Sequence, residues 1–183
     1  MASDSPPIQL KVTLRDVHPL IWRRLLVPGE TTLAKLHLVL QVAMGWEDYH
    51  LHGFRIGEKR YGPADYEDVM PDEIDESTVT LAEAFGESRK FFYDYDFGDS
   101  WEHEIVLEKT TSTEPQRFAR CLAGKRACPP EDSGGVWGYA SLLEALADES
   151  HEEHEEYLEW AGEDFDPEAF SLAVVNVHLK GLG

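Results

Sequence analysis

Hydrophobic and polar side chains alternate strictly near the start of the chain. In residues 8–15 (IQLKVTLR) every second side chain is aliphatic, a period of two that is typical of a strand with one buried face. A turn at 16–19 and the apolar run 20–27 (LIWRRLLV) predict an antiparallel partner for this strand. Residues 50–62 and 90–109 show strand patterns on both sides of a turn that contains Gly. The sequence therefore predicts three hairpins.

Apolar residues at helical spacing predict a helix between the first two hairpins, at residues 33–44. Thr31 or Thr32 can cap its first turn, and Gly45 is well placed to end it. A shorter helix is expected near residues 81–85, within an acidic loop that joins the second hairpin to the third.

The C-terminal part shows helical patterns in several segments. One helix is expected from Gly138 to Ala147, and the acidic segment after it is expected to be helical as well. The last helix is predicted at 168–179, because Asp166 and Pro167 suit a cap and a first turn. The side chains expected on its inward face are Phe170, Ala173, Val174, Val177 and His178.

This order of elements, with hairpins first and helices last, predicts an α+β fold with a mostly antiparallel sheet. The length of 183 residues suits one domain that needs no disulfide or metal ion to fold. We expect residues 8–183 to form that domain, with 1–7 as a disordered leader and about 137–181 as an acidic helical tail.

Net charge is the least ordinary property of the composition. The chain has 16 Lys and Arg against 36 Asp and Glu, which gives a formal net charge of −20. Direct binding of DNA or RNA is not expected, because nucleic-acid affinity comes mainly from basic side chains on phosphates. The acids are expected chiefly to keep the protein soluble, and they also favour a basic protein as a partner.

The N-terminal sequence lacks the basic and apolar regions of a signal peptide. No apolar run approaches the roughly 18 residues that indicate a membrane span. Two cysteines without a secretion signal indicate a reducing compartment. We therefore expect a cytoplasmic protein with free thiols and no membrane contact.

One face of the third hairpin carries large aromatic residues, among them Tyr93, Tyr95 and Trp101. His103 shares this face, and the favoured interpretation is a core histidine held by a hydrogen bond. The alternative is a pocket histidine whose ring is oriented by Asp96 or Asp99, as carboxylates orient metal-binding or general-base histidines.

Histidines and cysteines also raise the hypothesis of a zinc site. His50 and His52 share one strand face, so both can reach one ion. Cys121 and Cys128 have the spacing C-x6-C and not the C-x2-C of a structural zinc site. The further ligands that the cysteines need would come from His50, His52, His103 or Asp132. The favoured interpretation makes both thiols buried small side chains.

Four stretches resemble the plasmid pRi ORF-three-like family, named after the third open reading frame of the Ri plasmid. They are IQLKVTLRDVHPLIWRRLLVP, QVAMGW followed by HLHGFRI, YDYDFGDSWEHEIVLE, and CLAGKRACPPEDSGGVWGY, and together they cover about residues 8–180. The resemblance implies a single α+β domain without an established activity. Some relatives carry resolvase-like or repressor-like labels through association with mobile elements, and the acidic composition supports neither chemistry. The family pattern has a third Cys where this chain has Ser133, which argues against a metal role for the cysteines.

The favoured function is a non-enzymatic binding module for a small ligand or a basic protein. The pocket is expected beside the loop 121–135 and is expected to be lined by Trp22, His50, His52, Tyr93, Tyr95, Asp99, Trp101 and His103. In this hypothesis the loop closes over the third hairpin as the wall of the site, and His103 lies at its centre.

Two alternatives belong to other functional classes. The first is a metal-dependent hydrolase or transferase that uses His50, His52, His103 and Asp99. Zinc is the cofactor to test for it, and metal analysis separates it from a binding module. The second and weaker alternative is an acidic protein that competes with DNA for a DNA-binding partner.

Overall fold

One sheet and five helices make up the computed structural model, which describes residues 5–64, 72–110, 112, 114–162 and 164–183. The strands are β1 (Ile8–Leu14), β2 (Trp22–Val27), β3 (His52–Ile56), β4 (Lys59–Gly62), β5 (Glu73–Asp75), β6 (Lys90–Tyr95), β7 (Trp101–Glu108) and β8 (Arg120–Lys125). The helices are α1 (Leu33–Met44), α2 (Leu81–Phe85), α3 (Gly135–Ala147), α4 (His154–Ala161) and α5 (Leu172–Gly181).

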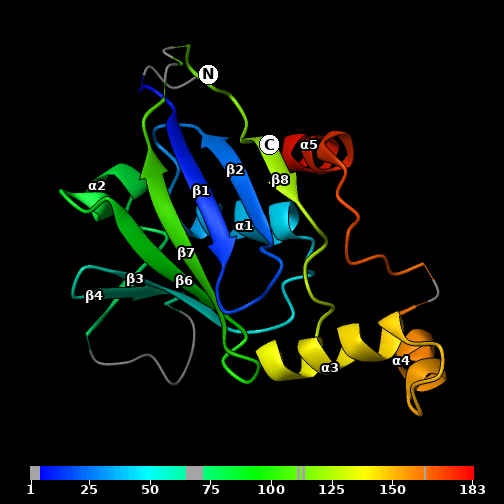
Figure 1. Ribbon diagram of the computed structural model, residues 1–183. Helices are drawn as coiled ribbons and strands as arrows, with labels where there is room; N and C mark the ends of the chain where they lie inside the picture. The colour runs from blue at the N-terminus through cyan, green and yellow to red at the C-terminus, as the bar shows by residue number, and fades with distance from the viewer. Residues whose placement is uncertain (1–4, 65–71, 111, 113, 163) are drawn as a thin grey trace.

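The eight strands form one sheet in the order β5-β4-β3-β6-β7-β1-β2-β8 (Figure 1). Neighbouring strands are antiparallel, except that β4 and β5 are parallel. The three predicted hairpins are β1–β2, β3–β4 and β6–β7. The α+β prediction with a mostly antiparallel sheet is therefore confirmed.

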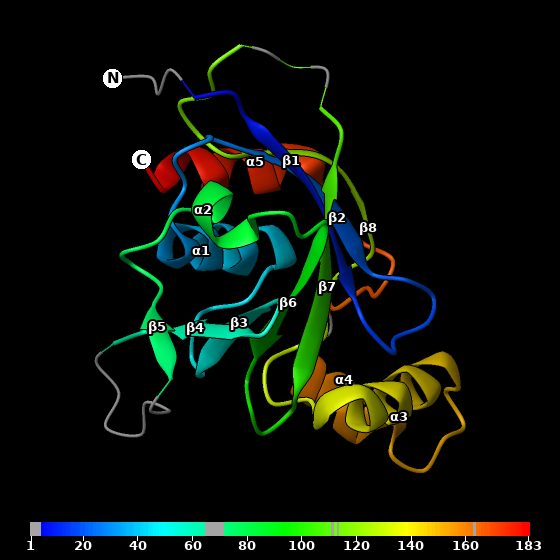
Figure 2. The same cartoon turned by 90° about the vertical axis from the view of Figure 1, so that its left-hand side faces the viewer.

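The two faces of the sheet differ as the alternation in β1 predicts. Leu10, Val12 and Leu14 are fully buried on the inner face. Helices α1, α2 and α5 lie on the inner side of the sheet, whereas the other face of β1, β2 and β7 carries no helix (Figure 2). The core therefore lies between the sheet and α1.

Helix α1 covers the core as predicted from its apolar stripe. Its cap is Thr32 rather than Thr31, because the Thr32 side chain accepts a hydrogen bond from the Lys35 amide at 3.2 Å. Gly45 ends the helix in the left-handed conformation, at φ 107°, which favours glycine.

The outer face carries acidic side chains that are paired with basic ones. Arg55 donates hydrogen bonds to both carboxylate oxygens of Asp94, at 2.7 and 3.1 Å, and also donates to Glu102. Lys90 pairs with Glu104 at 2.9 Å. These cross-strand pairs neutralise the carboxylates that the central strands present to solvent.

The prediction for the last helix was wrong in its start and its inward face. Helix α5 begins at Leu172, where the Ser171 side chain caps it by accepting from the Val174 amide. Val174 and Val177, expected to point inward, are exposed. The Pro167 carbonyl accepts a hydrogen bond from the Ala127 amide, so this segment follows the connection after β8 and does not join the helix.

Two strands were not predicted from the sequence. Strand β8 overlaps the start of residues 121–135, which carry both cysteines and are called the cysteine segment below. It pairs with β2 across an irregularity between Arg24 and Leu25. Strand β5 has only three residues and pairs with β4. Neither has the regular alternation that reveals a strand.

The expected disordered leader is described in part. Residues 1–4 lie outside the described residues. Pro7 is buried, and a Cβ atom on Gly29 would lie 2.4 Å from the Pro6 carbonyl oxygen. Residues 5–7 therefore pack against the turn after β2. Among the described residues, no helix combines the length and the apolar character needed to cross a membrane.

Candidate functional site

Connections that are far apart in the sequence meet at one end of the sheet. They are residues 45–51 between α1 and β3, 96–100 between β6 and β7, and 126–134 between β8 and α3. The β6–β7 turn lies beside the start of α3 (Figure 1). The indole nitrogen of Trp46 donates a hydrogen bond to the Pro129 carbonyl at 3.0 Å, which ties the first connection to the third.

The cysteine segment closes over the third hairpin, as the sequence predicted. A carboxylate oxygen of Asp99 accepts a hydrogen bond from the Gly134 amide at 3.0 Å. A Cβ atom on Gly135 would lie 2.6 Å from the Asp99 carbonyl oxygen, and Gly135 has a φ of 68°. Only glycine allows this close approach.

Four side chains meet where these connections converge, and we call His50, Asp96, Glu131 and Asp132 the loop-end site. The Nε2 atom of His50 lies 3.0 Å from Asp132 Oδ1, 3.6 Å from Asp96 Oδ2 and 3.8 Å from Glu131 Oε2. Among the described residues, all ion pairs of these three carboxylates are with His50. One imidazole thus faces three carboxylates without help from Lys or Arg.

Two buried polar atoms in the loop-end site have unsatisfied hydrogen-bonding capacity. His50 Nε2 and Glu131 Oε2 are shielded from solvent, and neither has a partner in hydrogen-bond geometry within the described structure. Such atoms are rare in folded proteins, because leaving a buried polar group unpaired costs about 1–3 kcal/mol.

Neighbouring groups hold the carboxylates of the loop-end site in place. Asp96 is buried, and its Oδ1 atom accepts from the amides of Gly98 and Asp99 at 2.9 and 3.3 Å, which leaves Oδ2 for His50. Asp96 and Asp132 both have positive φ angles, 54° and 56°. This left-handed region is uncommon for residues other than glycine, although aspartate adopts it more often than most.

Tyr95 fixes the orientation of the Glu131 carboxylate. Its hydroxyl donates to Glu131 Oε1 at 2.9 Å and accepts from the Tyr49 amide at 3.0 Å. Burial, and then this bond to Glu131, raise the pKa of Tyr95 well above its usual range. The hydroxyl therefore stays protonated and acts as a fixed donor to the carboxylate.

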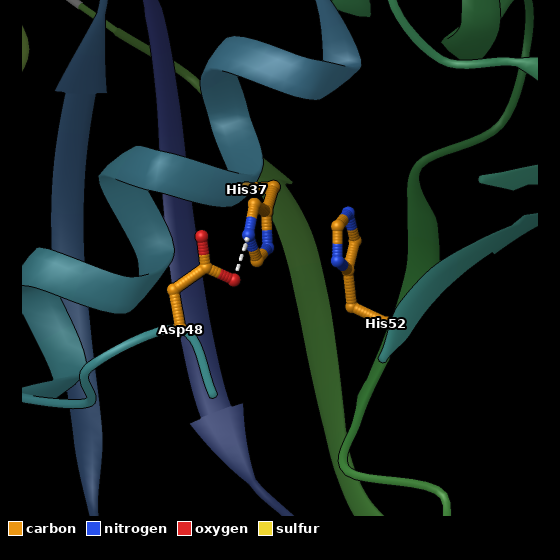
Figure 3. Close-up of side chains that lie close together, drawn as sticks. All are labelled: His37, Asp48 and His52. Atoms are coloured by element: carbon orange, nitrogen blue, oxygen red, sulfur yellow. Dashed lines mark hydrogen bonds and ion pairs between the residues drawn. The ribbon is translucent and has the colours of Figure 1, made fainter. Parts of the chain in front are cut away.

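A second polar cluster consists of His37 in α1, Asp48 in the connection after α1 and His52 at the start of β3. We call these three residues the paired-histidine cluster (Figure 3). The rings of His37 and His52 stack with centroids 3.4 Å apart. His37 Nε2 lies 2.8 Å from an Asp48 carboxylate oxygen. Burial, followed by the neighbouring His52, lowers the pKa of His37.

His37 was not predicted as a site residue, although the chain carries a signal for it. His37 and Gln41 are spaced four residues apart on the otherwise apolar face of α1, and both are buried. Polar residues at that spacing on a core-facing stripe indicate a buried hydrogen-bond network. Here both residues lie within hydrogen-bond distance of the Tyr93 hydroxyl, at 2.8 and 3.0 Å.

Several of the predicted pocket residues pack in the core. Tyr93, Trp101 and His103 are at most 1% exposed. His103 Nδ1 lies 3.1 Å from the Tyr93 carbonyl, and burial lowers the pKa of His103 to about 4. The structure thus places His103 as a neutral core histidine, and His50 lies where His103 was expected. The carboxylate of Asp99 contacts the Gly134 amide instead.

Trp22 lies apart from the other predicted pocket residues. Its partner across the β1–β2 pair is Thr13, on the outer face of the sheet. Lys11 and Arg24 lie over its ring, 5.7 and 5.4 Å from the centroid. Trp22 therefore lies among charged side chains on the outer face of the sheet.

Both cysteines are free, Cys121 buried and Cys128 half-buried. Burial raises the pKa of Cys121, and it raises that of Cys128 to about 12, although the Arg23 guanidinium opposes both shifts. Nucleophiles and metal ligands require a thiolate, which these environments disfavour. Among the described residues, the clusters with metal-ligand spacing contain histidines and aspartates and neither cysteine.

A groove of about 500 Å³ lies next to the loop-end site. Its floor is mostly apolar and includes Met44, Trp46, Cys128, Pro129, Phe165 and Phe170. Glu131 lines this groove and also belongs to the loop-end site. A ligand in the groove would therefore lie beside the carboxylates.

Comparison with known proteins agrees with the resemblance seen in the sequence. Residues 7–174 match the model of the plasmid pRiA4b ORF-3-like protein family. The chain is 43% identical over 178 residues to the uncharacterized protein y4hQ of Sinorhizobium fredii, covering 96% of this chain and 91% of that protein. It is also similar to a crystal structure of the protein of unknown function MM3350 from Methanosarcina mazei Go1. That structure has a TM-score of 0.83 and 40% identity, over 91% of this chain and 96% of that chain. The chain therefore belongs to the plasmid pRiA4b ORF-3-like family.

Proposed function

We propose that the chain is a binding protein whose loop-end site takes a divalent metal ion. The observation that carries this proposal is that His50 Nε2 faces three carboxylate oxygens within 3.8 Å, with no basic side chain paired to them in the described structure. Carboxylates crowded in a partly buried place repel one another, and a divalent cation relieves that repulsion.

The donor set indicates which ions to test. One imidazole nitrogen with two or three carboxylate oxygens suits Mn²⁺ or Zn²⁺ better than an all-oxygen ion such as Ca²⁺. The Asp132 side chain is 70% exposed, so one side of the site opens to solvent. An ion held there keeps a position for water or for an outside ligand.

Metal analysis tests this proposal. Protein purified without a chelating tag is dialysed against Mn²⁺ or Zn²⁺, and the bound metal is measured by elemental analysis and calorimetry. We expect at least one ion per chain, one of them at the loop-end site, and we expect Asp132→Asn to weaken the binding of that ion. Asp16→Asn is the matched control, because Asp16 is also exposed and has a φ of 61° but lies outside the site.

Binding of a basic partner instead of a metal ion is the result that would contradict this proposal. If neither ion binds but a Lys- or Arg-rich peptide does, and Asp132→Asn weakens the peptide, the carboxylates serve a protein partner and the metal proposal fails. The competitor hypothesis is a special case of that outcome, and it requires the partner to be a DNA-binding protein.

A metal-dependent hydrolase is the second candidate, and the groove beside Glu131 favours it. A metal ion with an open position can lower the pKa of bound water and supply a nucleophile. The groove would hold an apolar part of the substrate next to that water. Ester and phosphoester substrates, assayed with and without Mn²⁺ or Zn²⁺, test this candidate. Activity that His50→Ala removes would support it, and activity unaffected by that substitution would contradict it.

A further inference from the structure

One ring nitrogen of each histidine in the paired-histidine cluster is held by a protein group from outside the cluster. His52 Nε2 lies 3.0 and 3.1 Å from the two carboxylate oxygens of Glu76, a buried acid. His37 Nδ1 lies 2.8 Å from the Tyr93 hydroxyl. Metal-binding histidines characteristically use one nitrogen in this way, which fixes the ring while the other nitrogen binds the ion.

The remaining nitrogens are those that a metal ion would use. His52 Nδ1 is buried and has no hydrogen-bond partner in the described structure, and its side chain is only 6% exposed. His37 Nε2 faces the Asp48 carboxylate at 2.8 Å. The three residues can each offer a ligand atom within 4.8 Å of the others. Figure 3 shows the His37 ring of α1 with the Asp48 carboxylate on one side and the His52 ring, from the start of β3, on the other.

Ring stacking does not itself explain why these histidines lie together. The planes are 3° from parallel, with centroids 3.4 Å apart, and a face-to-face arrangement is not one that aromatic rings prefer. The unpaired His52 Nδ1 adds a cost to the arrangement. A shared ligand would compensate both features.

We propose that His37, Asp48 and His52 form a second metal site, separate from the loop-end site, that binds a zinc-class ion and joins α1 to β3. Two imidazoles and one carboxylate are a common donor set for Zn²⁺ and Fe²⁺. The ion replaces the proton of His37 Nε2, and the imidazole proton then lies on Nδ1, facing Tyr93. An imidazole lone pair lies in the ring plane, so the two rings tilt toward the ion as it binds.

Glu76 and Tyr93 act as positioning residues in this arrangement. Glu76 holds the His52 ring in place through Nε2. Asp48 supplies the exposed side of the site, since its side chain is 45% exposed. The Asp48 amide donates to Gln41 at 2.9 Å, so α1 also fixes the backbone that carries this ligand.

The experiment uses the full chain with the loop-end site disabled by His50→Ala and Asp132→Asn. Zn²⁺ is titrated by calorimetry, and X-ray absorption counts the imidazoles bound to it. We expect about one Zn²⁺ per chain with two imidazoles. Adding Asp48→Asn should weaken binding at least about tenfold, whereas adding Asp16→Asn should leave it unchanged. Asp48→Asn keeps the size of a half-exposed side chain, so folding is preserved.

Glu76→Gln separates a positioning role from a ligand role. We expect it to weaken Zn²⁺ binding about tenfold while two imidazoles remain bound, because outer-shell partners are worth 10–100-fold. The proposal is overturned if the disabled background binds no Zn²⁺, if only one imidazole is counted, or if Asp48→Asn binds as tightly as Asp16→Asn. None of these results bears on the loop-end site, which is absent from every variant in the series.

Discussion

Two groups of acidic side chains, one on the outer face of the sheet and one at its loop end, have opposite electrostatic surroundings. On the outer face, Asp94 shares its carboxylate with Arg55. At the loop end, two residues further along the same hairpin, Asp96 has no Lys or Arg partner among the described residues and shares His50 with two more carboxylates. In a chain with a net charge of −20, the carboxylates on the outer face are therefore neutralised by basic side chains, whereas those at the loop end are not.

The difference shows that the position of acids in the fold is more informative than their number. Asp94 lies within β6, where neighbouring strands supply cross-strand partners. Asp96 lies beyond the end of that strand, where connections from three parts of the chain converge. Paired acids support the sheet, and unpaired acids are the ones available to a ligand.

The largest expected effect is on metal affinity. His50→Ala removes the nitrogen ligand of the loop-end site, and we expect it to weaken Mn²⁺ or Zn²⁺ binding at that site by more than about 100-fold, measured in an Asp48→Asn background, since even outer-shell partners are worth 10–100-fold. Asp94→Asn removes an equal charge from the paired group and should leave the affinity unchanged. Calorimetry on both variants decides, and an equal loss in the two would mean that general charge attracts the ion.

The second effect is on stability when metal is present. In an Asp48→Asn background, which weakens the paired-histidine cluster, and at a free ion concentration of 100 times the dissociation constant of the loop-end site, binding should raise the free energy of unfolding by about 2.7 kcal/mol. Denaturant unfolding with and without chelator measures it. We expect Asp94→Asn to retain this increment and Asp132→Asn to lose most of it. An increment that survives in Asp132→Asn would place the ion elsewhere in the chain.

A third, smaller effect should have opposite signs in the two regions of the metal-free protein. Asp94→Asn breaks a pair with Arg55 and should lower the free energy of unfolding by about 0.5–1 kcal/mol. Glu131→Gln removes an unbalanced charge but keeps an oxygen for Tyr95, so it should raise that free energy by a similar or smaller amount. Urea unfolding with chelator present measures both variants. A lower free energy of unfolding in both would contradict the predicted difference between the two regions.

The smallest effect is a pH dependence on the outer face. Hydrogen bonds from Arg24 lower the pKa of Glu108, so this pair stabilises the fold above the ordinary Glu pKa of about 4.3. That contribution is lost as the pH falls through the lower, folded-state pKa. Arg24→Met should therefore cost up to about 1 kcal/mol near neutral pH and progressively less under acid. A cost that does not change with pH would indicate lost packing alone.

Much of the fold could be predicted from local pattern. Strand alternation located the three hairpins, and leucine spacing with Thr32 and Gly45 located α1. Helix α5 was placed too early because Asp166 and Pro167 also form a turn, which the Pro167 contacts to the β8–α3 connection favour.

The candidate site was harder to predict because its parts come from distant connections. Alternation showed correctly which face His103 occupies, but it could not show that this face is fully buried there. His50 was recognised as a possible ligand, whereas its grouping with Asp96, Glu131 and Asp132 depends on how three connections fold back. Asp48 was missed for the same reason, whereas His37 was missed although its spacing of four residues from Gln41 on α1 is a local signal.

The most direct test is a crystal soaked in Zn²⁺ and measured at the zinc absorption edge. We expect an anomalous peak about 2.0–2.2 Å from His50 Nε2 and from carboxylate oxygens of Asp96 and Asp132. A peak at the paired-histidine cluster alone, or none within reach of His50 at saturating Zn²⁺, would contradict metal binding at the loop end.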